Sequence, residues 1–318
     1  MHKANSDKIK IGISSCLMGE RVRFDTGHKR NAYINAVLTP YFEFTSFCPE
    51  VEIGLGTPRA PLRLVTFGDE VRCVGTRDPE LDVTQKLYQA ADQSKSWHKH
   101  LSGYILKKDS PSCGMERVRL YKGDTPGRKG VGLYADRMMQ NFPDLPVEEE
   151  GRLEDPVLRE NFIQRVYIYR RWQDLMEEPF SIRSVEQFHA RHKYIYMSHD
   201  PLLARELGAW LAQNQQTDLP TLAAEYLSKA MTLLKQTATR KGHTNTLQHI
   251  QGYLREHLTA DDRLELTTNI DEYRKGLLPL IVPITLLRHY FRHHPNNYID
   301  QSYYMQPHPA ELSLLNNL

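Results

Sequence analysis

The sequence contains little cysteine, with 4 thiols in 318 residues. So few thiols exclude a disulfide-scaffolded protein. No two of them are spaced as Cys-x-x-Cys, which excludes a zinc finger and a ferredoxin-type run of cluster ligands. Each cysteine is therefore expected to be buried, to bind a metal or to be reactive.

Long hydrophobic runs and an excess of one charge are also missing. The most apolar stretch, residues 277–287, is shorter than the ~20 residues that span a bilayer. The first seven residues contain no apolar signal-peptide core, so we expect a cytoplasmic protein with no membrane partner. Lys plus Arg number 41 and Asp plus Glu 39, a net charge of +2. This balance excludes a strongly basic nucleic-acid binder but leaves room for local basic patches.

The chain is long enough for two globular domains of ~150 residues each. Residues 1–180 show short alternating stretches between helical ones, which favours an α/β domain with a mostly parallel, Rossmann-like sheet. The expected elements are strands at 8–16, 41–47 and 103–106, a hairpin of 62–67 with 71–74, helices at 30–38, 83–101 and 157–172, and a polar breaker at 147–151.

Residues 181–318 contain almost no strand signal and predict an all-α domain, so we place the boundary near residue 180. From residue 184 onward there are 13 basic and 13 acidic residues, so this domain is not a basic clamp. Its His189-x-x-His192 pair and its tyrosines could pack in a core or contact phosphates and bases. Helices are expected at 185–198, 202–213, 219–239, 244–258, 260–275 and 281–293.

Three cysteines, Cys16, Cys48 and Cys113, each lie at the predicted end of a strand, beside a turn residue. Loops at the carboxyl ends of parallel strands converge, so these thiolates could bind a metal centre together. Three thiolates are one short of the four that saturate a [4Fe–4S] cluster, which would leave one iron open to substrate. Three ordinary buried cysteines are an equally good interpretation of the spacing alone. Cys73 lies within a strand and is expected simply to be buried.

The cysteine contexts are parts of longer motifs. These are VRFD at 22–25, CPEVEIGL at 48–55, PRAP at 58–61 and KxxSPSCG at 107–114. Together they resemble the thiouracil desulfidase family over the first half of the chain. The second half, with FHxxHKY at 188–194, GHTNTLQH at 242–249 and YIxQxY at 298–303, resembles a helical domain fused to such enzymes. The two-domain arrangement is similar to that of desulfidases that act on 4-thiouridine in transfer RNA (tRNA).

The resemblance implies an enzyme with a [4Fe–4S] cluster held by Cys16, Cys48 and Cys113. Glu50 matches the family's catalytic carboxylate and Ser110 its assisting hydroxyl. Converting C=S to C=O is a net hydrolysis that needs no external electron. A thiophilic iron polarises the C–S bond while a carboxylate takes a proton from the attacking water. Without the resemblance, Glu50 would be a solvated loop acid and Ser110 an ordinary turn residue.

Basic residues surround these motifs, and five of them are candidate contacts to substrate or RNA phosphates. As a group they suit an RNA substrate, although each alone could be solvated surface charge. The candidates are Arg23, Lys29, Arg59, Lys107 and Lys108.

Three other functions compete with the desulfuration of 4-thiouridine in tRNA. The protein could desulfurate free thiouracil or thionucleosides, although a small base does not require a fused helical domain. It could be a non-catalytic iron–sulfur sensor. All four cysteines could form a structural zinc site, which would then need Cys73. The sequence does not identify the sulfur acceptor.

Overall fold

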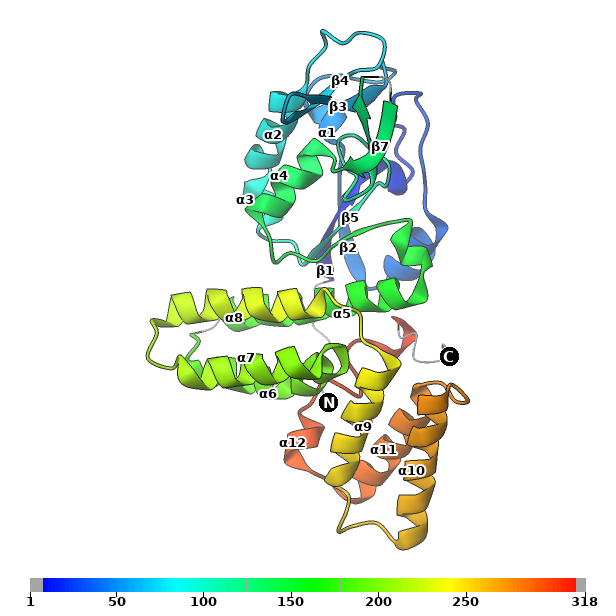
Figure 1. The fold of residues 1–318 in the computed structure, drawn as a ribbon, viewed down its shortest axis with the longest axis vertical. Helices are drawn as coiled ribbons and strands as arrows, with labels where there is room; N and C mark the ends of the chain where they lie inside the picture. The colour runs from blue at the N-terminus through cyan, green and yellow to red at the C-terminus, as the bar shows by residue number, and fades with distance from the viewer. Residues whose placement is uncertain (1–7, 124, 178, 313–318) are drawn as a thin grey trace. The chain divides into compact units, whose positions relative to one another are not determined.

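The computed structural model describes residues 8–123, 125–177 and 179–312 (Figure 1). Residues 1–7, where no signal-peptide core is expected, lie outside this set. The chain forms two compact units divided between Asp155 and Pro156, earlier than the predicted boundary near 180. The division is earlier because Ile168 and Trp172 pack into the hydrophobic core of the second unit. No helix in the described ranges is long and apolar enough to cross a membrane.

The first unit is built on a four-stranded parallel sheet in the order β2-β1-β5-β8. Ile11, Ile13 and Ile105 are fully buried in it. This confirms the predicted α/β class. The strand order reverses between β1 and β5, and in doubly wound sheets ligands bind outside the carboxyl ends of the strands at such a point. The strands are β1 (Ile9–Ser14), β2 (Phe42–Phe47), β5 (Gly103–Leu106) and β8 (Val147–Glu149).

A second, mixed sheet in the order β4-β3-β6-β7 belongs to the same unit. The hairpin of β3 (Leu62–Phe67) and β4 (Glu70–Gly75) is antiparallel, as the sequence predicts. The second hairpin, β6 (Val118–Lys122) with β7 (Thr125–Gly130), is not among the predicted elements. Only the β3–β6 pairing in this sheet is parallel.

Short helices complete the first unit, and α2 packs against α4 (Figure 1). The predicted helix over 83–101 is interrupted at Ser94, which ends α2 and precedes α3. The predicted helix over 30–38 contains a π-helical turn, Ile34–Leu38. The helices are α1 (Pro49–Glu52), α2 (Thr84–Gln93), α3 (Lys95–His98) and α4 (Leu133–Asn141).

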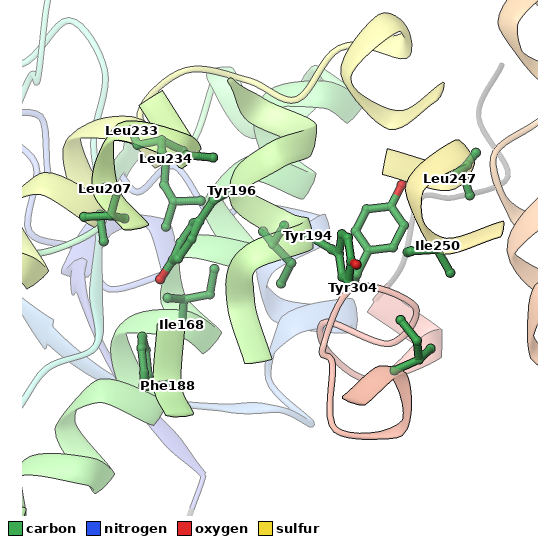
Figure 2. Close-up of a cluster of buried hydrophobic side chains, with 14 of the residues drawn as sticks. Ile168, Phe188, Tyr194, Tyr196, Leu207, Leu233, Leu234, Leu247, Ile250 and Tyr304 are labelled. Atoms are coloured by element: carbon green, nitrogen blue, oxygen red, sulfur yellow. The ribbon is translucent and has the colours of Figure 1, made fainter. Parts of the chain in front are cut away.

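The second unit is helical in its described residues, as predicted. Its core contains buried aromatic residues among aliphatic ones; Figure 2 shows Tyr196 beside Leu207, Leu233 and Leu234. Side-chain caps fix several helix starts, as when Asp200 accepts from the N–H of Leu203. The helices are α5 (Pro156–Glu177), α6 (Ile182–His199), α7 (Pro201–Gln213), α8 (Leu219–Leu234), α9 (Arg240–Gly252), α10 (Ala260–Lys275), α11 (Ile281–His293) and α12 (Asn297–Asp300).

Candidate active site

One cavity of about 460 Å³ lies at the carboxyl edge of the parallel sheet. Its volume is in the ~300–1,000 Å³ range of small-molecule sites. All ten residues singled out from the sequence line this cavity. They are Cys16, Arg23, Lys29, Cys48, Glu50, Arg59, Lys107, Lys108, Ser110 and Cys113.

The three cysteines reach the cavity because the sheet order brings together the ends of their strands. Cys16 lies in a 3-10 turn, Ser15–Leu17, directly after β1. Cys48 follows β2 and caps α1, while Cys113 lies in the loop after β5. Since β1 pairs with both β2 and β5, three loops distant in sequence meet at one edge.

Cys73 is separate from this group. It is fully buried in β4, and its backbone N–H donates to Thr84 Oγ1 at 2.9 Å. It does not line the cavity. Among the described residues, no three His, Cys, Asp or Glu side chains are arranged to hold a single metal ion. The position of Cys73 in β4, outside the cavity that the other three cysteines line, speaks against the four-cysteine zinc site. A four-iron cluster is larger, and each of its thiolates binds a different iron.

Burial raises the pKa of the three cavity thiols. The pKa of Cys16 rises to about 11 because burial outweighs the lowering effect of Lys107. Burial also raises the pKa of Cys48 and Cys113. Without a metal these groups are therefore neutral thiols at pH 7. A metal centre binds the thiolate form and would displace these protons.

The carboxylate of Glu50 is held on both oxygens. Arg59 Nε and Nη2 lie 2.8 and 2.7 Å from Oε2. The hydroxyl of Ser112 donates to Oε1 at 2.8 Å. The side chains of Arg59 and Glu50 are only 6% and 14% exposed. Glu50 is therefore a fixed carboxylate at the cavity rather than a solvated loop acid.

Ser110 organises the loop that contains Cys113. Its Oγ accepts from the N–H groups of Ser112 at 3.3 Å and Cys113 at 3.1 Å. Its carbonyl oxygen accepts from the N–H of Gly114 at 2.8 Å. The turn role expected from the Ser-Pro dipeptide is thus present. Ser110 Oγ is the acceptor in both of its hydrogen bonds to backbone N–H groups. Its hydroxyl proton is therefore available to donate to another group.

The start of α4 holds the same loop from the other side. The N–H groups of Leu133 and Ala135 donate to the carbonyls of Pro111 and Ser112 at 3.1 and 3.0 Å. A Cβ at Gly132 would lie 2.5 to 2.7 Å from backbone atoms of Ser112 and Cys113. Glycine at position 132 is therefore what allows this close contact.

Three consecutive glutamates, 148–150, lie at the end of β8, and two of them bond to the loops around the cavity. The interpretation of 147–151 as a polar breaker is wrong, because these side chains are buried at the carboxyl edge of the sheet. Glu149 Oε1 accepts from the N–H of Met115 at 2.8 Å. Glu150 forms an ion pair with Lys107 and accepts from the N–H of Lys108 at 2.7 Å. Such acids are hard to interpret from sequence because most of their partners come from other loops.

The five basic candidates divide into two kinds. Arg59 and Lys107 are mostly buried and paired with Glu50 and Glu150, so they position other groups. Lys29 and Lys108 are exposed, and Arg23 is partly exposed with Asp25 3.6 Å away. Two further residues of the site, Ser112 and Gly132, are not among those predicted from the sequence. Ser112 lies within the motif of residues 107–114, whereas Gly132 is distant in sequence and contacts this motif through its backbone N–H.

Comparison with known proteins agrees with these observations. Residues 11–150 match the family model for 2-thiouracil desulfurase. Residues 193–309 match the model for a protein of unknown function, DUF1722. These two matches confirm the resemblance inferred from the motifs, one in each half of the chain.

The chain is also similar to two curated proteins that are named as uncharacterized. The uncharacterized protein YbgA of Escherichia coli (strain K12) is 28% identical over 151 residues, which are 47% of this chain and 89% of the relative. The uncharacterized protein YbbK of Bacillus subtilis (strain 168) is 28% identical over 151 residues, 46% of this chain and 98% of the relative. A solved structure, a [4Fe-4S]-dependent thiouracil desulfidase named TudS, is 29% identical. It has a TM-score of 0.38 and covers 46% of this chain and 94% of its own.

Proposed function

We propose that the protein is a [4Fe–4S]-dependent desulfidase that converts 4-thiouridine in tRNA to uridine without net redox change. The observation that carries this proposal is the meeting of Cys16, Cys48, Cys113 and Glu50 in one cavity. The match of residues 11–150 to a thiouracil desulfurase model supports the reaction class.

The donor set fits a cluster with three protein ligands. Cys16, Cys48 and Cys113 would hold it, and the cavity presents no fourth cysteine. Arg23 and Lys107 act on Cys16 as positive charges and would offset the negative charge of a thiolate-bound cluster. When bound, the cluster supplies a thiophilic Lewis acid at its open iron, which polarises the C=S bond.

Glu50 would handle the proton of the attacking water. Its Oε2 is occupied by two bonds from Arg59, whereas Oε1 accepts only the Ser112 hydroxyl among the described residues. A carboxylate oxygen has two acceptor sites, so Oε1 keeps one for a proton from water. Arg59 and Ser112 hold the carboxylate in place, so it needs little reorganisation during the reaction.

Ser110 would assist through its free hydroxyl proton. Its oxygen is fixed by two backbone N–H groups, so the proton has few directions open to it. It can orient the water or hydrogen-bond the substrate oxygen as it forms. A hydrogen bond of this kind is worth ~1 kcal/mol between neutral groups and more to a charged one.

The tRNA part of the proposal rests on the fused helical unit and on the exposed cations. Lys29 and Lys108 line the cavity and are exposed, so they can reach phosphates. A 4-thiouridine inside folded RNA would be turned out of its stack to reach the cavity.

A substrate comparison tests this proposal. Anaerobically reconstituted protein is incubated with bulk bacterial tRNA, with free 4-thiouridine and with free thiouracil, and the products are measured by nucleoside mass spectrometry. We expect loss of 4-thiouridine from tRNA matched by a gain of uridine. Conversion of the free compounds alone would assign the enzyme to salvage. No conversion by cluster-loaded protein would favour the sensor.

A further inference from the structure

The helical unit contains a second cavity with positive charge, of about 330 Å³. It lies between α5 and α6 and is closed on one side by the segment after α12. Arg171, Arg191, His192 and Tyr303 line it. Tyr303 belongs to residues 193–309, which match a model of unknown function, and His192 lies directly before this range.

Arg171 is a half-buried cation that lacks a full set of partners. Its Nη2 donates to the carbonyl of Pro307, and its guanidinium carbon lies 3.6 Å from the ring centroid of Tyr303. Its Nη1 is buried and has no hydrogen-bond partner among the described residues. Burial lowers the pKa of Arg171 to about 10. Buried charges in proteins are normally paired, so this one calls for an anion.

The acid that lines this cavity does not satisfy Arg171. Asp174 also lines the cavity, but its carboxylate is 2.8 Å from Arg170 Nη2. Arg191 adds a second positive charge at the same cavity, and its side chain is exposed. One half-buried and one exposed arginine, beside an acid that is already paired, leave the cavity with excess positive charge.

His192 gives the cavity a neutral polar wall rather than a third cation. Its Nδ1 lies 2.7 Å from the Phe188 carbonyl oxygen, so this nitrogen carries the proton and donates. Burial lowers the pKa of His192, and Nε2 has no partner in the described part of the chain. The ring stacks between Phe188 and Tyr303, at centroid distances of 4.1 and 4.8 Å.

We infer that the cavity of Arg171 and Arg191 binds a phosphate group of the RNA backbone. Guanidinium groups present paired N–H donors that match phosphate oxygens. The inference rests on the proposed function in taking RNA as the substrate, and it adds a binding site distinct from the cysteine cavity. It also explains how a helical unit with 18 basic and 17 acidic residues can contribute to RNA affinity.

Equilibrium binding of bulk bacterial tRNA at several salt concentrations tests the inference. Arg191→Ala should weaken binding about 10-fold near 100 mM salt and lower the salt slope by about one. Arg171→Lys should weaken binding too, because lysine keeps the charge and loses the planar donor pair. The control Arg205→Ala removes an exposed arginine from α7 in the same unit and should change affinity less than about two-fold.

The outcomes separate the two proposals. If the original protein binds and desulfurates tRNA but Arg191→Ala and Arg171→Lys bind as it does, the phosphate site is wrong and the proposed function stands. If the original protein converts free 4-thiouridine but does not bind tRNA, the tRNA assignment falls and the phosphate site falls with it. If Arg171→Lys fails to fold, the result with Arg191→Ala decides alone. The Arg191 side chain is exposed, so its removal should not disturb folding.

Discussion

At the residue scale, the candidate site consists of a few side chains whose hydrogen-bond and ion-pair partners are known. Glu50 is the clearest case, because Arg59 and Ser112 fix its two oxygens separately. Its position two residues after Cys48 places it beside the thiols by chain connectivity alone. Its partners Arg59 and Ser112 lie nine and 62 residues away in sequence, so only the structure identifies them.

Replacing Glu50 by Gln should stop turnover and leave the cluster bound. Gln is nearly the same size but cannot accept a proton from water at neutral pH. We expect a loss of ~10²–10⁴-fold in turnover, the usual contribution of a general base. Iron and sulfide content and the visible absorption of the cluster should match those of the original protein. A variant that kept its turnover would remove Glu50 from the mechanism.

The cysteines divide into three ligands and one core residue. Cys16→Ala, Cys48→Ala and Cys113→Ala should each lower the iron content after anaerobic reconstitution, because each removes one of three thiolates. Cys73→Ala is the matched control and should retain iron, since Cys73 lies in β4 away from the cavity. Loss of iron in the Cys73 variant at unchanged folding would revive the four-cysteine site.

At the element scale, the cavity depends on how the loop after β5 is clamped. The start of α4 donates to its carbonyls, and Glu149 in β8 accepts from the N–H of Met115. Strands β1, β2 and β5 and the hairpin of 62–75 could be predicted, because alternation and turn residues are local signals. The burial of Glu149 and Glu150 could not, because it depends on long-range partners such as Met115 and Lys107.

Gly132→Ala tests this clamp. The added methyl would lie 2.5 Å from the Ser112 carbonyl carbon, so the loop with Cys113 must move. We expect a loss of ~1–3 kcal/mol in stability and a lower iron content. Gly127→Ala in β7 is the control, because its nearest atom would be at 3.5 Å. Equal iron content in the two variants would show that the loop tolerates the shift.

At the scale of the whole molecule, the chain joins two units with separate cores. In the second unit α10 and α11 have the expected bounds, whereas the helices predicted at 219–239 and 244–258 are observed as Leu219–Leu234 and Arg240–Gly252. The assignment of α5 to this unit was not predictable, because its apolar spacing does not reveal which core it packs into. The charged cavity beside Arg171 likewise depends on packing between α5, α6 and the C-terminal segment.

Buried histidines should make the protein less stable in mild acid. Burial lowers the pKa of His189 and His199 to about 4 and that of His243 to about 3. In the unfolded chain they titrate near 6.5, so between these values the unfolded state binds more protons. Stability should therefore fall as pH drops below about 6.5, by up to ~2 kcal/mol per histidine at pH 5. Denaturant unfolding at pH 7 and pH 5 checks this, and equal stabilities would contradict it.

In the proposed reaction, oxygen from water replaces the sulfur of 4-thiouridine in tRNA. The balanced reaction is C=S plus H₂O giving C=O plus H₂S, with no electron acceptor. The most direct measurement is mass spectrometry of uridine from tRNA treated with cluster-loaded protein in ¹⁸O-labelled water. We predict one ¹⁸O atom in each new uridine, in step with the loss of 4-thiouridine. Unchanged 4-thiouridine, or new uridine without the label, would contradict the account.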